Sequence, residues 1–214
     1  MPRLRSLTLA VALTAACSRH GPQPAPTVPD ASLSGLAAQH IAVLPTYAAR
    51  IAPELRWTTG RPLDLQRTLD ADILSALDER GLRKTWVFPE ELAAAYRRNP
   101  TYAADPFGLA EEPLRAPSLM VDTRLPDPLA SQIRTLIAFH EDVRYVLAPV
   151  ELRLETVPGA ISGTGRGVLR LVLLDARGSN VRWIGEISSE DAESYGPAIP
   201  ATIAARLANV ISPR

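Results

Sequence analysis

Hydrophobic and polar residues alternate most regularly between residues 144 and 188, and this stretch predicts three consecutive β-strands. In the first strand, apolar residues at every second position are separated by charged ones, which is typical of a strand with one solvated face. Two further apolar runs, at residues 168–174 and 181–187, flank a turn-forming stretch and predict a β-hairpin. The alternating strand consists of Val150, Leu152, Leu154 and Thr156 on the apolar side, and Glu151, Arg153 and Glu155 on the side expected to face water.

Helical periodicity appears on both sides of this block. Apolar residues recur along one stripe in residues 63–80, and Gly81 follows as the expected C′ residue. Short apolar runs at residues 41–45 and 85–88 predict two more strands. The order is β-α-β-α-α-β-β-β-α, and the predicted fold class is α/β, with a single mixed sheet of about five strands and helices packed on it. The other predicted helices span residues 89–98, 128–141 and 200–211.

Residues 1–16 predict a secretory signal peptide, because two arginines precede a short apolar run that ends in small residues. The run is shorter than the ~20 apolar residues of a membrane-spanning helix. Cys17 directly follows, as in the bacterial lipobox, in which the cysteine is acylated and anchors the protein to a membrane. The alternative is an ordinary cleaved signal peptide with an incidental cysteine. We expect a lipidated, proline-rich tether at residues 17–35 and a single α/β domain at residues 36–214.

A proline-rich loop is predicted at residues 100–128, where neither helical nor strand periodicity persists. A loop of this length in a compact domain is either functional or disordered. It carries several large apolar residues, so we expect it to fold back over the core, with a partner-binding surface as the alternative. The candidate partner contacts are Tyr102, Phe107, Leu109 and Leu114.

Composition excludes several classes of function. The formal net charge is +0 and no basic stripe occurs, so we expect no nucleic-acid binding. A single cysteine rules out a disulfide within the chain and a cysteine-ligated zinc site. His140 has acidic neighbours, but no His-x₃-His pair exists, so we predict neither a metal nor a cofactor.

No catalytic constellation is apparent. The glycine-rich residues 163–167 precede a predicted strand, whereas a phosphate-binding loop must lead into a helix. The sequence holds no Gly-x-Ser-x-Gly motif. Adjacent acidic residues can perform acid–base chemistry, but on surface elements they are usually solvated. We therefore expect that the protein is not an enzyme; the acidic neighbours considered are Glu90 with Glu91, Glu111 with Glu112, and Glu190 with Asp191 and Glu193.

Three short segments carry a family resemblance: residues 41–45, residues 143–147 and the hairpin at residues 168–187. They resemble segments of periplasmic lipoproteins related to the curli-secretion lipoprotein CsgG. The same domain is similar to the N-terminal part of the translocation protein TolB and to lipoprotein activators of cell-wall synthases. The matching hairpin positions are Asp175, Arg177, Gly178 and Trp183.

The resemblance implies an α/β domain that binds other envelope proteins, sometimes as a ring, without shared catalytic residues. We therefore expect a protein anchored through Cys17 to the periplasmic face of the outer membrane, where it scaffolds, assembles or regulates an envelope complex. The partner is an unidentified envelope protein, and a homo-oligomer is left open. The alternative is an envelope enzyme or a small-ligand-binding protein without a recognisable motif.

Overall fold

The computed structural model of the protein describes residues 33–140, 142–160 and 163–213. The predicted signal peptide (1–16), Cys17 and the tether up to residue 32 lie outside the described residues, so what the sequence indicates for them stays a prediction. The described chain starts with a buried Leu33 and the 3₁₀-helix η2 (Ser34–Ala38), slightly ahead of the expected domain start at residue 36.

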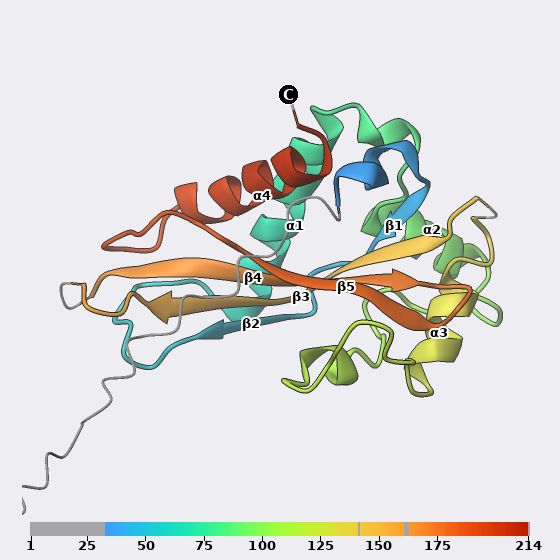
Figure 1. Cartoon of the computed structure of the whole chain (residues 1–214), viewed down its shortest axis with the longest axis horizontal. Coiled ribbons are helices and arrows are strands. Elements are labelled where there is room, and N and C mark those ends of the chain that lie inside the picture. The colour runs from blue at the N-terminus through green and yellow to red at the C-terminus, as the bar shows by residue number, and fades with distance from the viewer. Residues whose placement is uncertain (1–32, 141, 161–162, 214) are drawn as a thin grey trace, which may run out of the picture.

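A mixed sheet forms the centre of the domain (Figure 1). Strands β3 (Tyr145–Thr156), β4 (Gly165–Asp175) and β5 (Asn180–Ser188) form an antiparallel meander. Strands β1 (Ile41–Val43) and β2 (Ala48–Ile51) both pair in parallel with β3, so together they make an interrupted edge strand. The predicted fold class, α/β with one mixed sheet of five strands, is confirmed.

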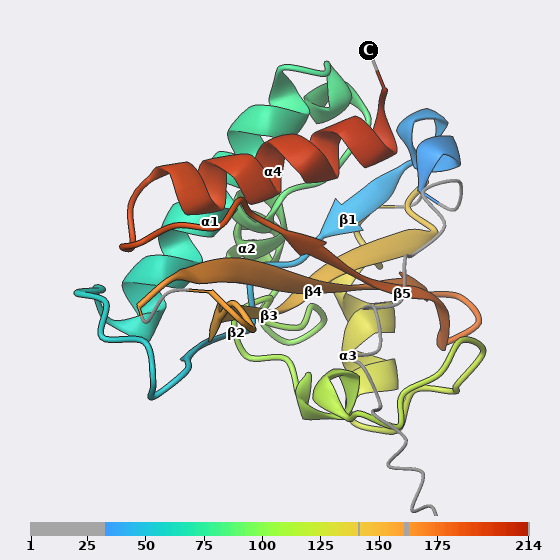
Figure 2. The same ribbon diagram turned by 60° about the vertical axis from the view of Figure 1, so that its left-hand side comes forward.

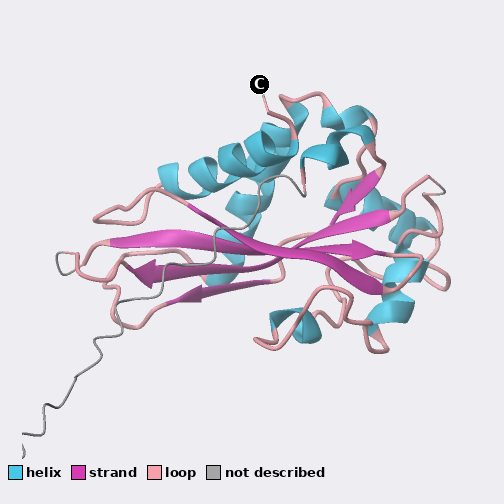
Figure 3. Ribbon diagram, in the orientation of Figure 1, coloured by secondary structure: helices cyan, strands magenta, loops and turns pink. Residues whose placement is uncertain are grey.

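Helices cover both faces of the sheet (Figures 2 and 3). Helices α1 (Pro62–Asp78) and α4 (Ala198–Ile211) pack with η2 on one face, over the first core cluster. Helices α2 (Pro89–Arg98) and α3 (Leu129–Leu136) pack with the proline-rich loop on the other face, over a second cluster. Two short 3₁₀-helices, η3 (Leu82–Lys84) and η4 (Glu112–Arg115), complete the described elements.

Helix α1 follows directly from its sequence. Pro62 occupies the first turn, where a missing N–H costs nothing. The stripe of Leu65, Leu69 and Leu77 is at most 2% exposed and packs against the sheet and α4. Gly81 has the left-handed conformation expected of it, with a φ of +74°, but it lies two residues beyond the Glu79 C-cap of α1 and not at C′.

Two predicted elements differ from the structure. Residues 85–88 form one bridge, between Val87 and Ala42, and no strand, because the N–H groups of Thr85 and Trp86 both donate to the Leu82 carbonyl in a turn. The second parallel segment of the sheet is instead β2, which the sequence pattern did not place. The predicted helix at 128–141 ends at Leu136 as α3.

Strand β3 contains a bulge that redistributes its side chains. Pro149 lacks an N–H and the register shifts between Pro149 and Glu151. Val150 therefore joins the cluster under α3, whereas Leu152 and Leu154 join the cluster under α1 and α4. The prediction of one apolar face was wrong for this strand, although all three side chains are buried.

None of the helices in the described ranges has the length and apolar character needed to cross a bilayer.

Candidate functional site

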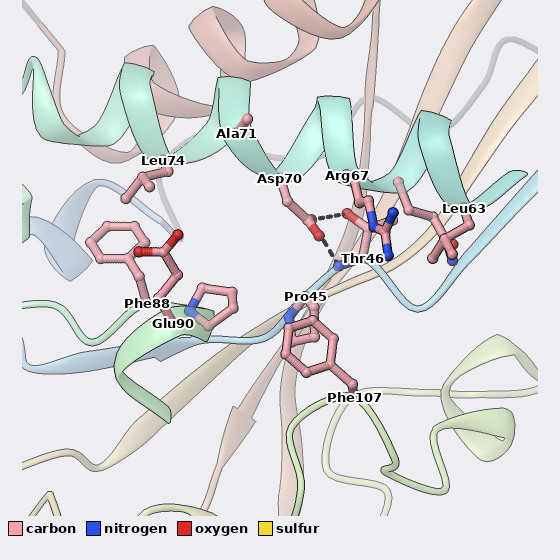
Figure 4. A pocket seen from close by; sticks show the side chains of 12 residues that line it. Pro45, Thr46, Leu63, Arg67, Asp70, Ala71, Leu74, Phe88, Glu90 and Phe107 are labelled. Atoms are coloured by element: carbon pink, nitrogen blue, oxygen red, sulfur yellow. Dashed lines mark hydrogen bonds between the residues drawn. The ribbon is translucent and has the colours of Figure 1, made fainter. Parts of the chain in front are cut away.

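A groove lies between α1 and the connection from β1 to β2, and we call it the α1 groove (Figure 4). Its volume is about 570 Å³, within the range of sites that hold small ligands or peptide side chains. Its lining is mainly apolar and comes from segments distant in sequence: Pro45, Thr46, Leu63, Gln66, Arg67, Asp70, Ala71, Leu74, Phe88, Pro89, Glu90 and Phe107.

The interruption of the edge strand shapes the groove. The N–H of Leu44 donates to the Leu147 carbonyl and the N–H of Tyr47 donates to the Pro149 carbonyl, so the chain stays beside β3 across the gap. Pro45 has no N–H to donate to the sheet. The N–H of Thr46, between these two attachments, donates to Asp70 on α1.

Thr46 and Asp70 form the polar centre of the α1 groove. The Thr46 backbone N–H and hydroxyl both donate to Oδ1 of Asp70, at 2.8 and 2.6 Å. Burial raises the pKa of the Asp70 carboxyl, and the two hydrogen bonds from Thr46 offset that effect only in part. Asp70 thus offers its second oxygen, Oδ2, in a largely apolar setting.

A second acidic residue, Glu111, is buried close to Asp70. Glu111 is 1% exposed, and its Oε2 atom is buried without a hydrogen-bond partner. Burial, and then the charge of Asp70, raises the pKa of Glu111 to about 8. Glu111 therefore keeps its proton at neutral pH. The expectation that it is a solvated surface residue was wrong, whereas its neighbour Glu112 is exposed.

An ion-pair network holds the loop beside the groove. Arg115 lies 2.7 Å from Glu151 on β3 and 3.3 Å from Glu112. The Tyr47 hydroxyl donates to Glu112 at 2.8 Å, and this hydrogen bond raises the pKa of Tyr47. The side chain of Glu151, expected to face water, is instead covered and only 8% exposed.

The four candidate contacts in the loop divide into two pairs. Tyr102 and Phe107 are 73% and 67% exposed, and Phe107 lines the α1 groove. Leu109 and Leu114 are 5% and 0% exposed and pack in the cluster under α3. The expectation that the loop folds back over the core is confirmed for Leu109 and Leu114. Partner binding by the loop stays a prediction, and among the four residues only Tyr102 and Phe107 are exposed for it.

The glycine-rich stretch serves packing. Gly165 and Gly167 lie within β4, so the glycines lead into a strand as predicted. A Cβ on Gly165 would lie 2.6 Å from Leu55 Cδ2, and one on Gly167 would lie 2.6 Å from Ile199 Cγ2. Both positions therefore require glycine for close packing against neighbouring side chains.

Groups of three or more metal-ligating side chains do not occur among the described residues. His140 is half-buried beyond the end of α3, and burial lowers its pKa. The expectations that the protein binds no metal and no cofactor stay predictions.

Sequence reasoning missed Thr46, Asp70 and the burial of Glu111. Asp70 follows Leu69 on the edge of the apolar stripe of α1, which is the one signal that it borders a packed surface. Nothing in the local sequence indicates that the β1–β2 connection meets it.

Comparisons with known proteins give structural likeness alone. No protein-family profile matches the chain, and no curated protein matches it. A PelC dodecamer from Paraburkholderia phytofirmans is similar at a TM-score of 0.40 and 12% identity, covering 82% of this chain and 90% of that one. Lipoprotein GNA1162 from Neisseria meningitidis is similar at 0.39 and 12% identity, covering 80% and 96%.

The C-terminal domain of LpoB from Salmonella enterica is similar at a TM-score of 0.36 and 10% identity, covering 76% of this chain and 96% of that one. One of these three neighbours is named a lipoprotein. The finer resemblance to CsgG and TolB stays a prediction. Likenesses at these TM-scores are too low to carry an assignment, so the function proposed for this chain rests on its own residues.

Proposed function

We propose that the protein is a lipid-anchored protein of the periplasmic face of the outer membrane, and that it scaffolds, assembles or regulates an envelope complex by binding another protein. The proposal contains no catalytic step. It combines the lipobox-like sequence ending at Cys17 with a domain that presents an apolar groove.

The observation that carries the binding role is the exposure of Phe107 beside the α1 groove. A phenylalanine that is 67% exposed and continuous with a mainly apolar groove is typical of an interaction site. The loop that presents it is held to β3 by Arg115 and Glu151, so the surface exists before a partner arrives.

Binding of a small ligand is the second candidate function. The groove volume and the Asp70 carboxyl within an apolar lining favour it, because small-molecule sites combine these two features.

Membrane fractionation of the full-length protein, followed by cross-linking in intact envelopes, tests the leading proposal. Wild type should sediment with membranes and cross-link to another envelope protein, and Cys17→Ala should release it into the soluble fraction. A soluble wild-type protein would contradict the anchor. A membrane-bound protein that forms no cross-link with any other protein would contradict the binding role. Light scattering of the purified protein reports whether it also self-associates.

A further inference from the structure

The α1 groove contains a carboxyl group without a compensating cation. Thr46 satisfies only Oδ1 of Asp70. Arg67 lines the same groove, yet the ion pairs among the described residues include none between Asp70 and Arg67, and none that involves Glu111. Asp70 is only partly exposed, so its carboxyl is partly desolvated and lacks the cation that such charges ordinarily have nearby.

Apolar side chains border this carboxyl. Leu63 on α1 is 48% exposed, and Phe107 on the loop is 67% exposed. In Figure 4, Phe107 lies with Pro45 across the groove from α1, which carries Asp70 and Leu63. A ligand seated here meets an apolar surface and a carboxylate oxygen together.

We propose that the α1 groove binds an extended segment of a partner protein, in which a lysine or arginine side chain pairs with Asp70 and an adjacent apolar side chain packs against Phe107 and Leu63. This inference rests on the proposed function and names the site and the chemistry of its partner. Charge complementarity selects the basic residue, because a cation would satisfy the free oxygen of Asp70 and offset its desolvation.

The affinity of Asp70 for a basic side chain should depend on pH. Burial raises the pKa of Asp70, and a bound cation stabilises the carboxylate and lowers that pKa. By linkage, binding of a basic side chain strengthens as the pH rises through the pKa of free Asp70 and levels off above it. Glu111, protonated at neutral pH, contributes no charge under those conditions.

Two variants isolate the charge at Asp70. Asp70→Asn keeps an oxygen that accepts the Thr46 hydrogen bonds, so it removes the charge while preserving the local structure. Asp78→Asn removes one charge from an exposed position of the same helix outside the groove. Thermal unfolding of both full-length variants checks that each is folded.

Arrays of short random peptides, probed with the full-length protein in detergent, provide the test. Bound peptides should be enriched in lysine or arginine next to a large apolar residue. Asp70→Asn should lose this preference and Asp78→Asn should keep it. A fluorescein-labelled peptide from the enriched set should bind Asp70→Asn about 10- to 100-fold more weakly, the effect expected when a charge-assisted hydrogen bond is lost. Replacement of its basic residue by norleucine should have an equal effect.

Several results would overturn the inference. If both variants bind the peptides equally, or if the enriched peptides lack basic residues, Asp70 does not take part in peptide recognition. Groove-dependent self-association would identify a second copy as the occupant, and competition by small amines alone would identify a small-ligand site. If envelope cross-linking finds a protein partner while the arrays show no basic preference, the inference fails and the proposed function stands. If the wild-type protein is soluble and has no envelope partner while the arrays show a basic preference, the proposed function fails and only the basic preference of the groove stands.

Discussion

The Arg115 guanidinium lies 2.7 Å from the Glu151 carboxylate, and this pair joins the proline-rich loop to the central strand of the sheet. The Glu151 side chain is 8% exposed and the Arg115 side chain 27% exposed. The alternating pattern of β3 predicts that Glu151 faces solvent, but the proline-rich loop covers its side chain. The pair therefore explains both the burial of an acidic strand residue and the ordered path of a loop with little regular structure.

We expect Arg115→Ala to destabilise the domain by about 2–3 kcal/mol, because it leaves Glu151 covered and without its closest cation. Urea unfolding followed by circular dichroism measures the difference. Arg50→Ala is the matched control: Arg50 is 68% exposed and 4.0 Å from the same carboxylate, so its removal should cost less than about 0.5 kcal/mol. Equal effects of the two variants would show that the loop is not held by Arg115.

Because the pKa of Glu111 is raised, we expect the stability of the domain to depend on pH. Its pKa in the folded state is raised from 4.5 to about 8, so the folded state retains a proton that the unfolded chain releases. This contribution to stability is fully present below the unfolded value and is lost as the pH rises toward about 8. Glu111→Gln cannot ionise and should escape the loss.

The measurement is the free energy of unfolding of wild type and Glu111→Gln at a series of pH values. The free energy of unfolding of Glu111→Gln minus that of wild type should grow by up to ~1.4 kcal/mol per pH unit between pH 4.5 and about 8, and stay constant above that range. Glu112→Gln, a change at the exposed neighbour, serves as the control. Its profile should run parallel to that of wild type, with a constant offset from its changed contacts with Tyr47 and Arg115. Parallel profiles for wild type and Glu111→Gln would show that Glu111 ionises in the folded protein as it does in the unfolded chain.

Gly167→Ala should destabilise the protein by about 1–3 kcal/mol, because the new Cβ would lie 2.6 Å from Ile199 Cγ2 and 3.0 Å from Ile203 Cδ1 of α4. Gly35→Ala, where nothing lies within 4 Å, is the control and should leave the midpoint of thermal unfolding nearly unchanged. If Gly167→Ala is neutral, α4 moves away from the sheet easily, and the packing role of this glycine is wrong.

The fold was largely predictable because most of its helices and strands show a clear local pattern of apolar residues. The stripe in α1 and the apolar runs of β4 and β5 each place their side chains correctly. The errors arose where distant segments decide the outcome. Strand β2 is recognisable only through its pairing with β3, and the burial of Glu151 depends on Arg115 from the loop.

The candidate site was predictable only in part for the same reason. Phe107 was identified as a large apolar residue in an irregular loop, and it lies on the groove. Asp70 becomes distinctive only because Thr46, 24 residues earlier, donates two hydrogen bonds to it. Glu111 differs from Glu112 only in what the fold places around it. Local sequence carries none of these long-range contacts.

Contact between the α1 groove and another envelope protein can be detected by site-specific photo-cross-linking. A photoreactive phenylalanine analogue replaces Phe107 in the full-length protein in cells, and in a matched control it replaces Met120, which is 69% exposed in the same loop and does not line the groove. We predict an adduct between position 107 and a distinct envelope protein, mapped to a segment with a basic residue beside an apolar one. Position 120 should give little adduct. Equal yields from the two positions, or an adduct from position 120 alone, would contradict this prediction.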